Sequence, residues 1–102
     1  MNEAIIQARF IKIVKEKNLG IAVKVNCASM RGWPDVVFVD FKGDVNLVEF
    51  KAQHGSLSPH QKGVHADLFK LNCVVVVLSS VNEVDDYIQL LEREYDFGRI
   101  KL

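Results

Sequence analysis

Two carboxylates and a lysine, Asp35, Glu49 and Lys51, occur at spacings that suit metal-dependent hydrolysis of a phosphodiester bond. Hard cations such as Mg²⁺ are bound by one or two carboxylates together with water and phosphate oxygens, and the backbone carbonyl of Phe50 can add another oxygen. A bound cation polarises the phosphoryl group and lowers the pKa of its water, while an ammonium stabilises charge that develops on phosphorus. The same acid-x-Lys pair also occurs by chance as a solvated strand face, so its place in the fold decides between the two interpretations.

These side chains fall on a predicted β-hairpin. The β-rich runs 36–39 and 47–50 flank a short polar turn that contains a glycine, a residue that tolerates the positive φ of hairpin turns. Antiparallel pairing returns the end of the second strand to the start of the first, which places Glu49 and Lys51 near Asp35. Because side chains alternate between the two faces of a strand, Glu49 and Lys51 share one face and their apolar neighbours form the packed face.

The remaining periodicity predicts an α/β fold with a mixed sheet flanked by helices. The expected order is a helix over residues 2–18, a strand over 21–25, the hairpin, a helix after Ser58, a strand over 73–78 and a last helix. Because the run 73–78 is apolar without alternation, we expect a central strand that is covered on both faces and parallel to the 47–50 strand.

Composition predicts one domain that spans residues 1–102, without a membrane partner. The apolar fraction is 49% and the charged fraction 25%, with no membrane-spanning run and no signal-peptide pattern, so we expect a cytoplasmic protein. Thirteen basic and thirteen acidic side chains give a net charge of zero, which is unusual for a nonspecific nucleic-acid binder. Any phosphate contacts must come from a few side chains, for which the candidates are Arg9, Lys12, Arg31, Lys51, Lys62 and Lys70.

The cysteines and histidines form no metal-binding pattern. Cys27 and Cys73 lack a partner motif and are interpreted as reduced thiols, with Cys73 buried in its strand. The histidines lack metal-ligand spacing with the cysteines and have no serine or cysteine nucleophile nearby. They are interpreted as surface or loop residues, and they are His54, His60 and His65.

Three sequence blocks resemble the VRR-NUC domain, the virus-type replication and repair branch of the PD-(D/E)XK nucleases. The blocks are Gly32-x-Pro34-Asp35, Val48-Glu49-Phe50-Lys51-Ala52 and Gly55-x-Leu57-Ser58-x-x-Gln61, and together with the predicted elements they cover nearly the whole chain in family order. The resemblance implies a restriction-endonuclease-like αβββαβ core and a DNA endonuclease dependent on Mg²⁺ or Mn²⁺. For short members from phage or bacteria it implies a homodimer that cleaves branched DNA, such as four-way (Holliday) junctions, in a bacterial or phage-infected cell.

Two further site residues each have two explanations. The resemblance makes Gln61 an active-site residue that orients water or Lys51, whereas Ser58 and Gln61 also form a capping box at the start of a helix. In the wider nuclease superfamily an acid from the first helix often completes the metal site, and Glu3 is the residue so placed. An acid in the first turn also complements the helix dipole.

Other functions and assemblies fit the same residues. A flap or nicking nuclease is the alternative within the enzyme class, and a noncatalytic DNA-binding or assembly domain is the alternative outside it. In that domain the pair of Glu49 and Lys51 is only a surface ion pair. For the homodimer, a second apolar side of the first helix, formed by Ile5, Ala8 and Ile11, is a candidate interface.

Overall fold

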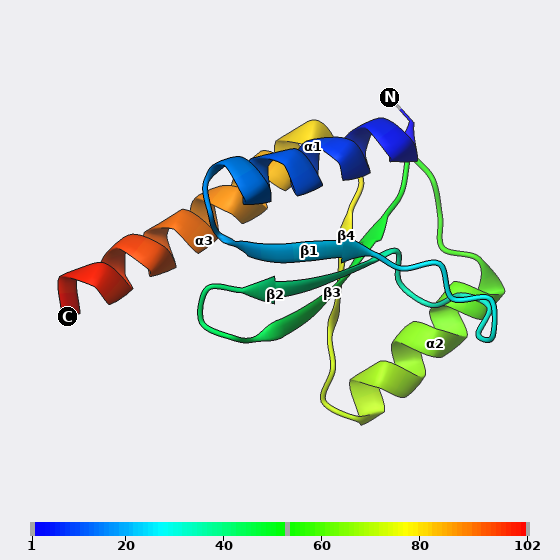
Figure 1. Cartoon of the computed structure of the whole chain (residues 1–102). Coiled ribbons are helices and arrows are strands. Elements are labelled where there is room, and N and C mark those ends of the chain that lie inside the picture. The colour runs from blue at the N-terminus through cyan, green and yellow to red at the C-terminus, as the bar shows by residue number, and fades with distance from the viewer. Residues whose placement is uncertain (1, 53, 102) are drawn as a thin grey trace.

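The structure, a computed structural model, describes residues 2–52 and 54–101, with side chains through residue 95 (Figure 1). The elements in chain order are α1 (Glu3–Glu16), β1 (Gly20–Lys24), β2 (Val36–Asp40), β3 (Val45–Phe50), α2 (Pro59–Lys70), β4 (Val75–Leu78) and α3 (Val81–Lys101). This order confirms the predicted α/β fold. No helix in these described ranges combines the length and the apolar character needed to cross a membrane.

The strands form one mixed sheet in the order β1-β2-β3-β4. β2 pairs antiparallel with β1 and β3, whereas β4 runs parallel to β3, which confirms the hairpin and the parallel crossover. In the hairpin Val36 lies opposite Val48. Asp35 comes directly before Val36 and Glu49 directly after Val48, so this register brings the two carboxylates to the same end of the hairpin.

The prediction of a central strand at residues 73–78 was wrong, because β4 is an edge strand. β3 already pairs with β2 on one side, so the parallel crossover places β4 on the other side, and no described strand pairs beyond it. Val74 is 66% exposed and Val77 37% exposed, and Cys73 is exposed instead of buried. Absence of alternation indicated an apolar strand, but it did not show which strands lie beside it.

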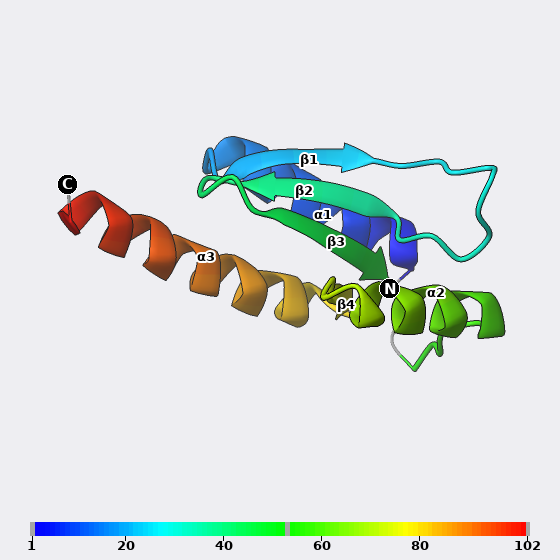
Figure 2. The same cartoon turned by 90° about the horizontal axis from the view of Figure 1, so that it is seen from below.

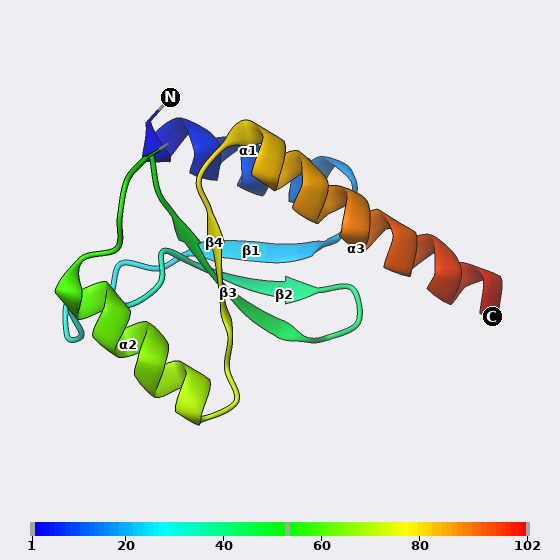
Figure 3. The ribbon, with the colours of Figure 1, turned by 180° about the vertical axis from the view of Figure 1, so that it is seen from behind.

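The hydrophobic core lies between the sheet and the two helices α1 and α3, which are on one side of it (Figures 1 and 3). Phe10 of α1 packs edge-on against Phe38 of β2, with ring centroids 5.4 Å apart, and also contacts Phe50 of β3. As predicted, Val48 and Phe50 face this core. The alternation of β3 therefore turns Glu49 to the other face.

That other face is only partly covered. α2 packs near β4, whereas Figure 2 looks onto β1–β3 with α1 behind them. In the strand register Ile21 lies opposite Val39, and Val39 opposite Val45, so aliphatic side chains form a continuous row across the three strands. We call Ile21, Val23, Val39 and Val45 the open sheet face; they are 68%, 53%, 37% and 65% exposed.

Candidate active site

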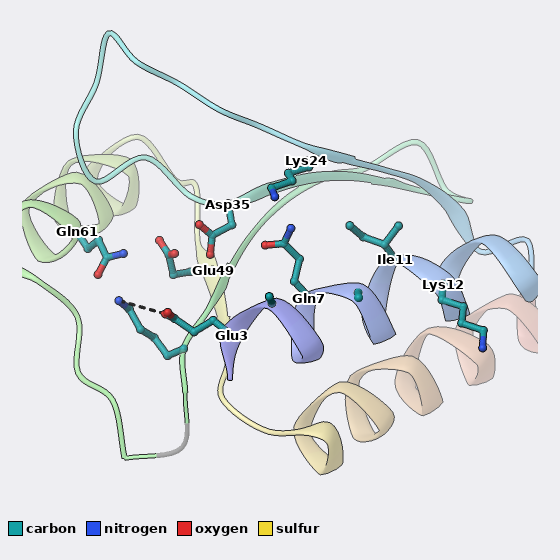
Figure 4. Close-up of a pocket in the computed structure, with 11 residues that line it drawn as sticks. Glu3, Gln7, Ile11, Lys12, Lys24, Asp35, Glu49 and Gln61 are labelled. Carbon is teal, nitrogen blue, oxygen red and sulfur yellow. Dashed lines mark ion pairs between the residues drawn. The ribbon is translucent and has the colours of Figure 1, made fainter. Parts of the chain in front are cut away.

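An open cavity of about 850 Å³ lies where α1, the start of β2, the end of β3 and the start of α2 meet (Figure 4). The cavity is lined by every predicted catalytic residue and by the predicted first-helix acid. They come from four separate segments of the chain, and they are Glu3, Asp35, Glu49, Lys51 and Gln61. The fold thus brings together the side chains that the three sequence blocks single out.

Asp35 and Glu49 form the acidic centre of this cavity. An Asp35 carboxylate oxygen, Oδ2, accepts a hydrogen bond from the backbone N–H of Phe50 at 2.9 Å, which ties the start of β2 to the end of β3. Glu49 is only 1% exposed, an unusual position for an acid. Its Oε1 atom is buried and has no hydrogen-bond partner among the described residues.

The surroundings of Glu49 favour its neutral form. Burial raises its pKa from the ordinary value of 4.5 to about 9, helped by hydrogen bonding to Asp35 and by the charges of Asp35 and Glu3, while Lys51 acts in the opposite direction. Without a cation, Glu49 is therefore protonated at neutral pH and shares its proton with Asp35. Two acids that share a proton are a place where a cation can replace that proton.

The donors at this centre are all oxygens, which fits a hard divalent cation such as Mg²⁺ or Mn²⁺. Within the described ranges, no group of three or more His, Cys, Asp or Glu side chains is arranged to hold a metal ion. The set present is instead two carboxylates, Asp35 and Glu49, next to the carbonyl of Phe50. Mg²⁺ characteristically combines such a small set with water and phosphate oxygens.

Lys51 and Glu3 face each other at the rim of the cavity. Lys51 Nζ lies 3.6 Å from Glu3 Oε1, the contact drawn as a dashed line in Figure 4. The Lys51 side chain is 16% exposed and that of Glu3 is 51% exposed. Glu3 stands in the first turn of α1, which is capped by Asn2, where an acid complements the helix dipole. A role for Glu3 at a metal site stays a prediction.

Gln61 has both of its expected arrangements at once. Its side-chain Oε1 accepts a hydrogen bond from the backbone N–H of Ser58 at 2.9 Å, and the backbone N–H of Gln61 donates to Ser58 Oγ at 3.2 Å, so the capping box is complete. The side chain also lines the cavity, where its amide nitrogen points toward Glu49 (Figure 4). The oxygen serves the helix and the nitrogen remains available to the site.

Gly32 explains how the loop before β2 meets the start of α2. Its φ is +88°, and a Cβ there would lie 2.6 Å from the carbonyl group of His60 and 2.8 Å from Gln61 N. Only glycine fits this approach without displacing backbone. The glycine of the first sequence block thereby brings the loop before β2 against the start of α2, which carries Gln61.

Three of the predicted DNA contacts, Arg9, Arg31 and Lys62, are not part of the cavity lining. Arg9 of α1 forms a two-point ion pair with Asp85 of α3, with both hydrogen bonds at 3.0 Å. Arg31 and Lys62 are exposed side chains on the loop before β2 and on α2. Their contacts with DNA stay predictions. Among the other candidates, Lys12 lines the cavity and Lys70 ends α2.

Sequence reasoning missed Gln7, Lys24 and His65. Gln7 lies one helical turn after Glu3, and Lys24 ends β1 opposite Val36, next to Asp35, so both line the cavity. The interpretation of His65 as a surface or loop residue was wrong, since its side chain lies on α2 and is 15% exposed. Burial, assisted by the charge of Lys51, lowers its pKa. A four-residue spacing from Glu3 and from Gln61 could have indicated Gln7 and His65.

Comparison with known proteins finds solved structures that are similar to this chain. No protein-family model matches the sequence, and no curated protein matches it. A solved structure described as "VRR_NUC domain" superimposes with a TM-score of 0.73 and 27% identity, and the match covers 85% of this chain and 94% of that one. A "VRR_NUC domain protein" gives a TM-score of 0.70 at 17% identity, over 87% and 86% of the two chains. Both matches share the restriction-endonuclease-like fold, and the first of them, with the three sequence blocks at one cavity, supports a VRR-NUC domain protein, a nuclease-type domain.

Proposed function

We propose that this protein is a DNA endonuclease that hydrolyses phosphodiester bonds with Mg²⁺ or Mn²⁺. The observation that carries the proposal is the pairing of Asp35 with a buried Glu49 whose pKa is raised to about 9, beside Lys51 in an open cavity. Burying Glu49 in this place has no structural benefit, since burial and the neighbouring Asp35 both disfavour its ionised form. A cation bound by the two carboxylates would account for this arrangement.

Each residue then has a role in hydrolysis. Asp35, Glu49 and the Phe50 carbonyl would hold the cation, which when bound supplies Lewis-acid polarisation of the phosphate and a more acidic water. Lys51 stabilises the negative charge that builds up on the phosphate oxygens. The amide of Gln61 donates to the attacking water or to a phosphate oxygen, and Glu3 holds Lys51 or an outer water in place.

We propose branched DNA, such as four-way junctions, as the substrate. The support is the resemblance of the sequence blocks, together with the zero net charge of the chain. A protein with few phosphate contacts has modest affinity for uniform duplex, and this affinity falls as salt rises. Lys12 and Lys24, which line the cavity, join Arg31 and Lys62 as candidates for these contacts.

The test is cleavage of a labelled four-way junction, a flap and a matching linear duplex with Mg²⁺ or Mn²⁺. We expect metal-dependent cleavage of the junction and a loss of about 10²-fold or more in Lys51→Ala, because the ammonium acts on charge in the transition state. Lys15→Ala, an exposed lysine of the same kind outside the cavity, is the control and should cleave normally. Cleavage of the flap alone would favour the flap nuclease. A folded protein that binds DNA and cleaves none of them would be the noncatalytic domain.

We also propose that the active form is a homodimer, with a second copy on the open sheet face. Resolving a junction needs two cuts, which a twofold dimer provides. The open sheet face is a continuous aliphatic surface. On α1, by contrast, Ile11 is partly buried against the core, so the second apolar side of this helix has less exposed apolar surface to offer a partner. Light scattering should give a dimer mass for wild type and a monomer mass for Val45→Lys. Leu90→Lys, also an exposed aliphatic position, should remain dimeric; a monomeric wild type contradicts the proposal.

A further inference from the structure

A histidine and a glutamate beneath the cavity face each other with unsatisfied atoms. His65 Nε2 of α2 lies 3.5 Å from Glu49 Oε1 of β3. These two atoms are buried, and neither has a hydrogen-bond partner in the part of the chain that the structure describes. The Glu49 side chain is 1% exposed and that of His65 is 15% exposed.

Such a pair is unusual because buried polar atoms are nearly always hydrogen-bonded, and leaving one unpaired costs about 1–3 kcal/mol. Here a ring nitrogen that can donate stands opposite a carboxyl oxygen that can accept. Their separation exceeds the usual N–H···O range by only a few tenths of an ångström. A small movement of either side chain therefore completes a hydrogen bond that satisfies both atoms.

We propose that His65 is a positioning residue of the active site, whose Nε2–H holds Glu49 Oε1 so that the other carboxylate oxygen is presented to the cavity. The inference rests on the proposed function, in which Glu49 is a cation ligand. An ionised ligand carboxylate has two oxygens, and a fixed donor on one of them sets the direction of the other. Without that donor, Glu49 would be free to rotate and would meet the cation in several orientations.

The location of His65 argues against direct contact with substrate. Its Nε2 is buried and faces Glu49, and His65 is not one of the described residues that line the cavity. His65 follows Gln61 by one helical turn, so α2 directs two polar side chains at the site. The close approach at Gly32 fixes the start of the same helix. α2 thus orients the site from behind, while the charged groups of Asp35, Lys51 and Glu3 also act on Glu49.

The test compares His65→Leu, which removes the donor, with His65→Gln, whose amide can replace it. Calorimetric titration with Mn²⁺ alone should show about 10–100-fold weaker binding in His65→Leu, the range seen when a partner of a metal ligand is removed. His65→Gln should recover most of the affinity, and junction cleavage should follow the same order. His60→Leu, at an exposed histidine of the same helix, is the control and should bind as wild type. The metal-free melting temperature of His65→Leu should not fall, which separates positioning from folding.

A measurement on wild type covers the case in which His65→Leu does not fold. Long-range ¹H–¹⁵N NMR should show the His65 hydrogen on Nε2 with Mg²⁺ bound; a bare Nε2 overturns the inference.

Unchanged Mn²⁺ affinity in His65→Leu with normal cleavage overturns the inference alone. Mn²⁺ binding that depends on His65 without any cleavage refutes the proposed function but supports the inference. A wild type that binds no Mn²⁺ overturns both, because Glu49 is then not a ligand.

Discussion

Glu49→Gln is expected to abolish DNA cleavage and, at the same time, to stabilise the metal-free protein at pH 8. Glutamine has the shape of protonated glutamic acid, and its amide can still donate to Asp35, so the fold is retained. It cannot become the anionic ligand that the cation requires, so we expect cleavage to fall by at least about 10³-fold, as for loss of an essential catalytic group. A substitution that inactivates and stabilises together marks a residue kept for function.

The stabilisation has a definite pH window. The pKa of Glu49 is about 9 in the folded protein and near 4.5 when unfolded. A carboxyl with a raised folded pKa stabilises the fold fully below pH 4.5, and this contribution is lost as pH rises toward 9. Wild type without metal should therefore become less stable between pH 5 and pH 8. Glu49→Gln has no titrating proton at this position, so it should not show this loss of stability.

Thermal melts in a chelator at pH 5 and pH 8 measure this difference. We expect the two proteins to be close at pH 5, and Glu49→Gln to be more stable at pH 8 by at least about 2 kcal/mol, or roughly 10 °C. Glu16→Gln, at an exposed carboxylate whose ion pair with Lys12 is long at 3.9 Å, is the matched control. It should change stability little at either pH. A parallel pH dependence in wild type and Glu49→Gln would show that Glu49 is ionised in the folded protein.

Local patterns predicted the elements and the acidic pair of this site. Alternation along residues 45–50 and the glycine turn before them determine that Asp35 and Glu49 meet, because a hairpin leaves little choice of register. The capping box predicted where α2 begins. The three sequence blocks marked residues that come together at one cavity.

Features that depend on packing between distant elements could not be predicted in the same way. The edge position of β4 follows from strand order, which an apolar run does not encode. The burial of His65 follows from how α2 lies on β3 and β4. Its four-residue spacing from Gln61 indicates that the two side chains share a helix face, but not that this face is buried. The two explanations of Gln61, as a helix cap and as a site residue, were treated as alternatives. They are compatible because the amide oxygen accepts from the Ser58 backbone while the amide nitrogen points toward Glu49.

The affinity for Mg²⁺ is expected to rise about tenfold for each pH unit between pH 6 and pH 8. Below the Glu49 pKa of about 9, binding must release one proton from the pair of acids, and each released proton adds one logarithmic unit of affinity per pH unit. Calorimetry in buffers of different ionisation enthalpy measures the released proton directly. Glu3→Gln should keep a slope near one, because the charge of Glu3 is the smallest contribution to the shift. Binding that neither releases a proton nor changes with pH would mean that the cation does not displace the shared proton. The raised pKa of Glu49 would then be a property of burial alone, and the cation site would have to lie elsewhere.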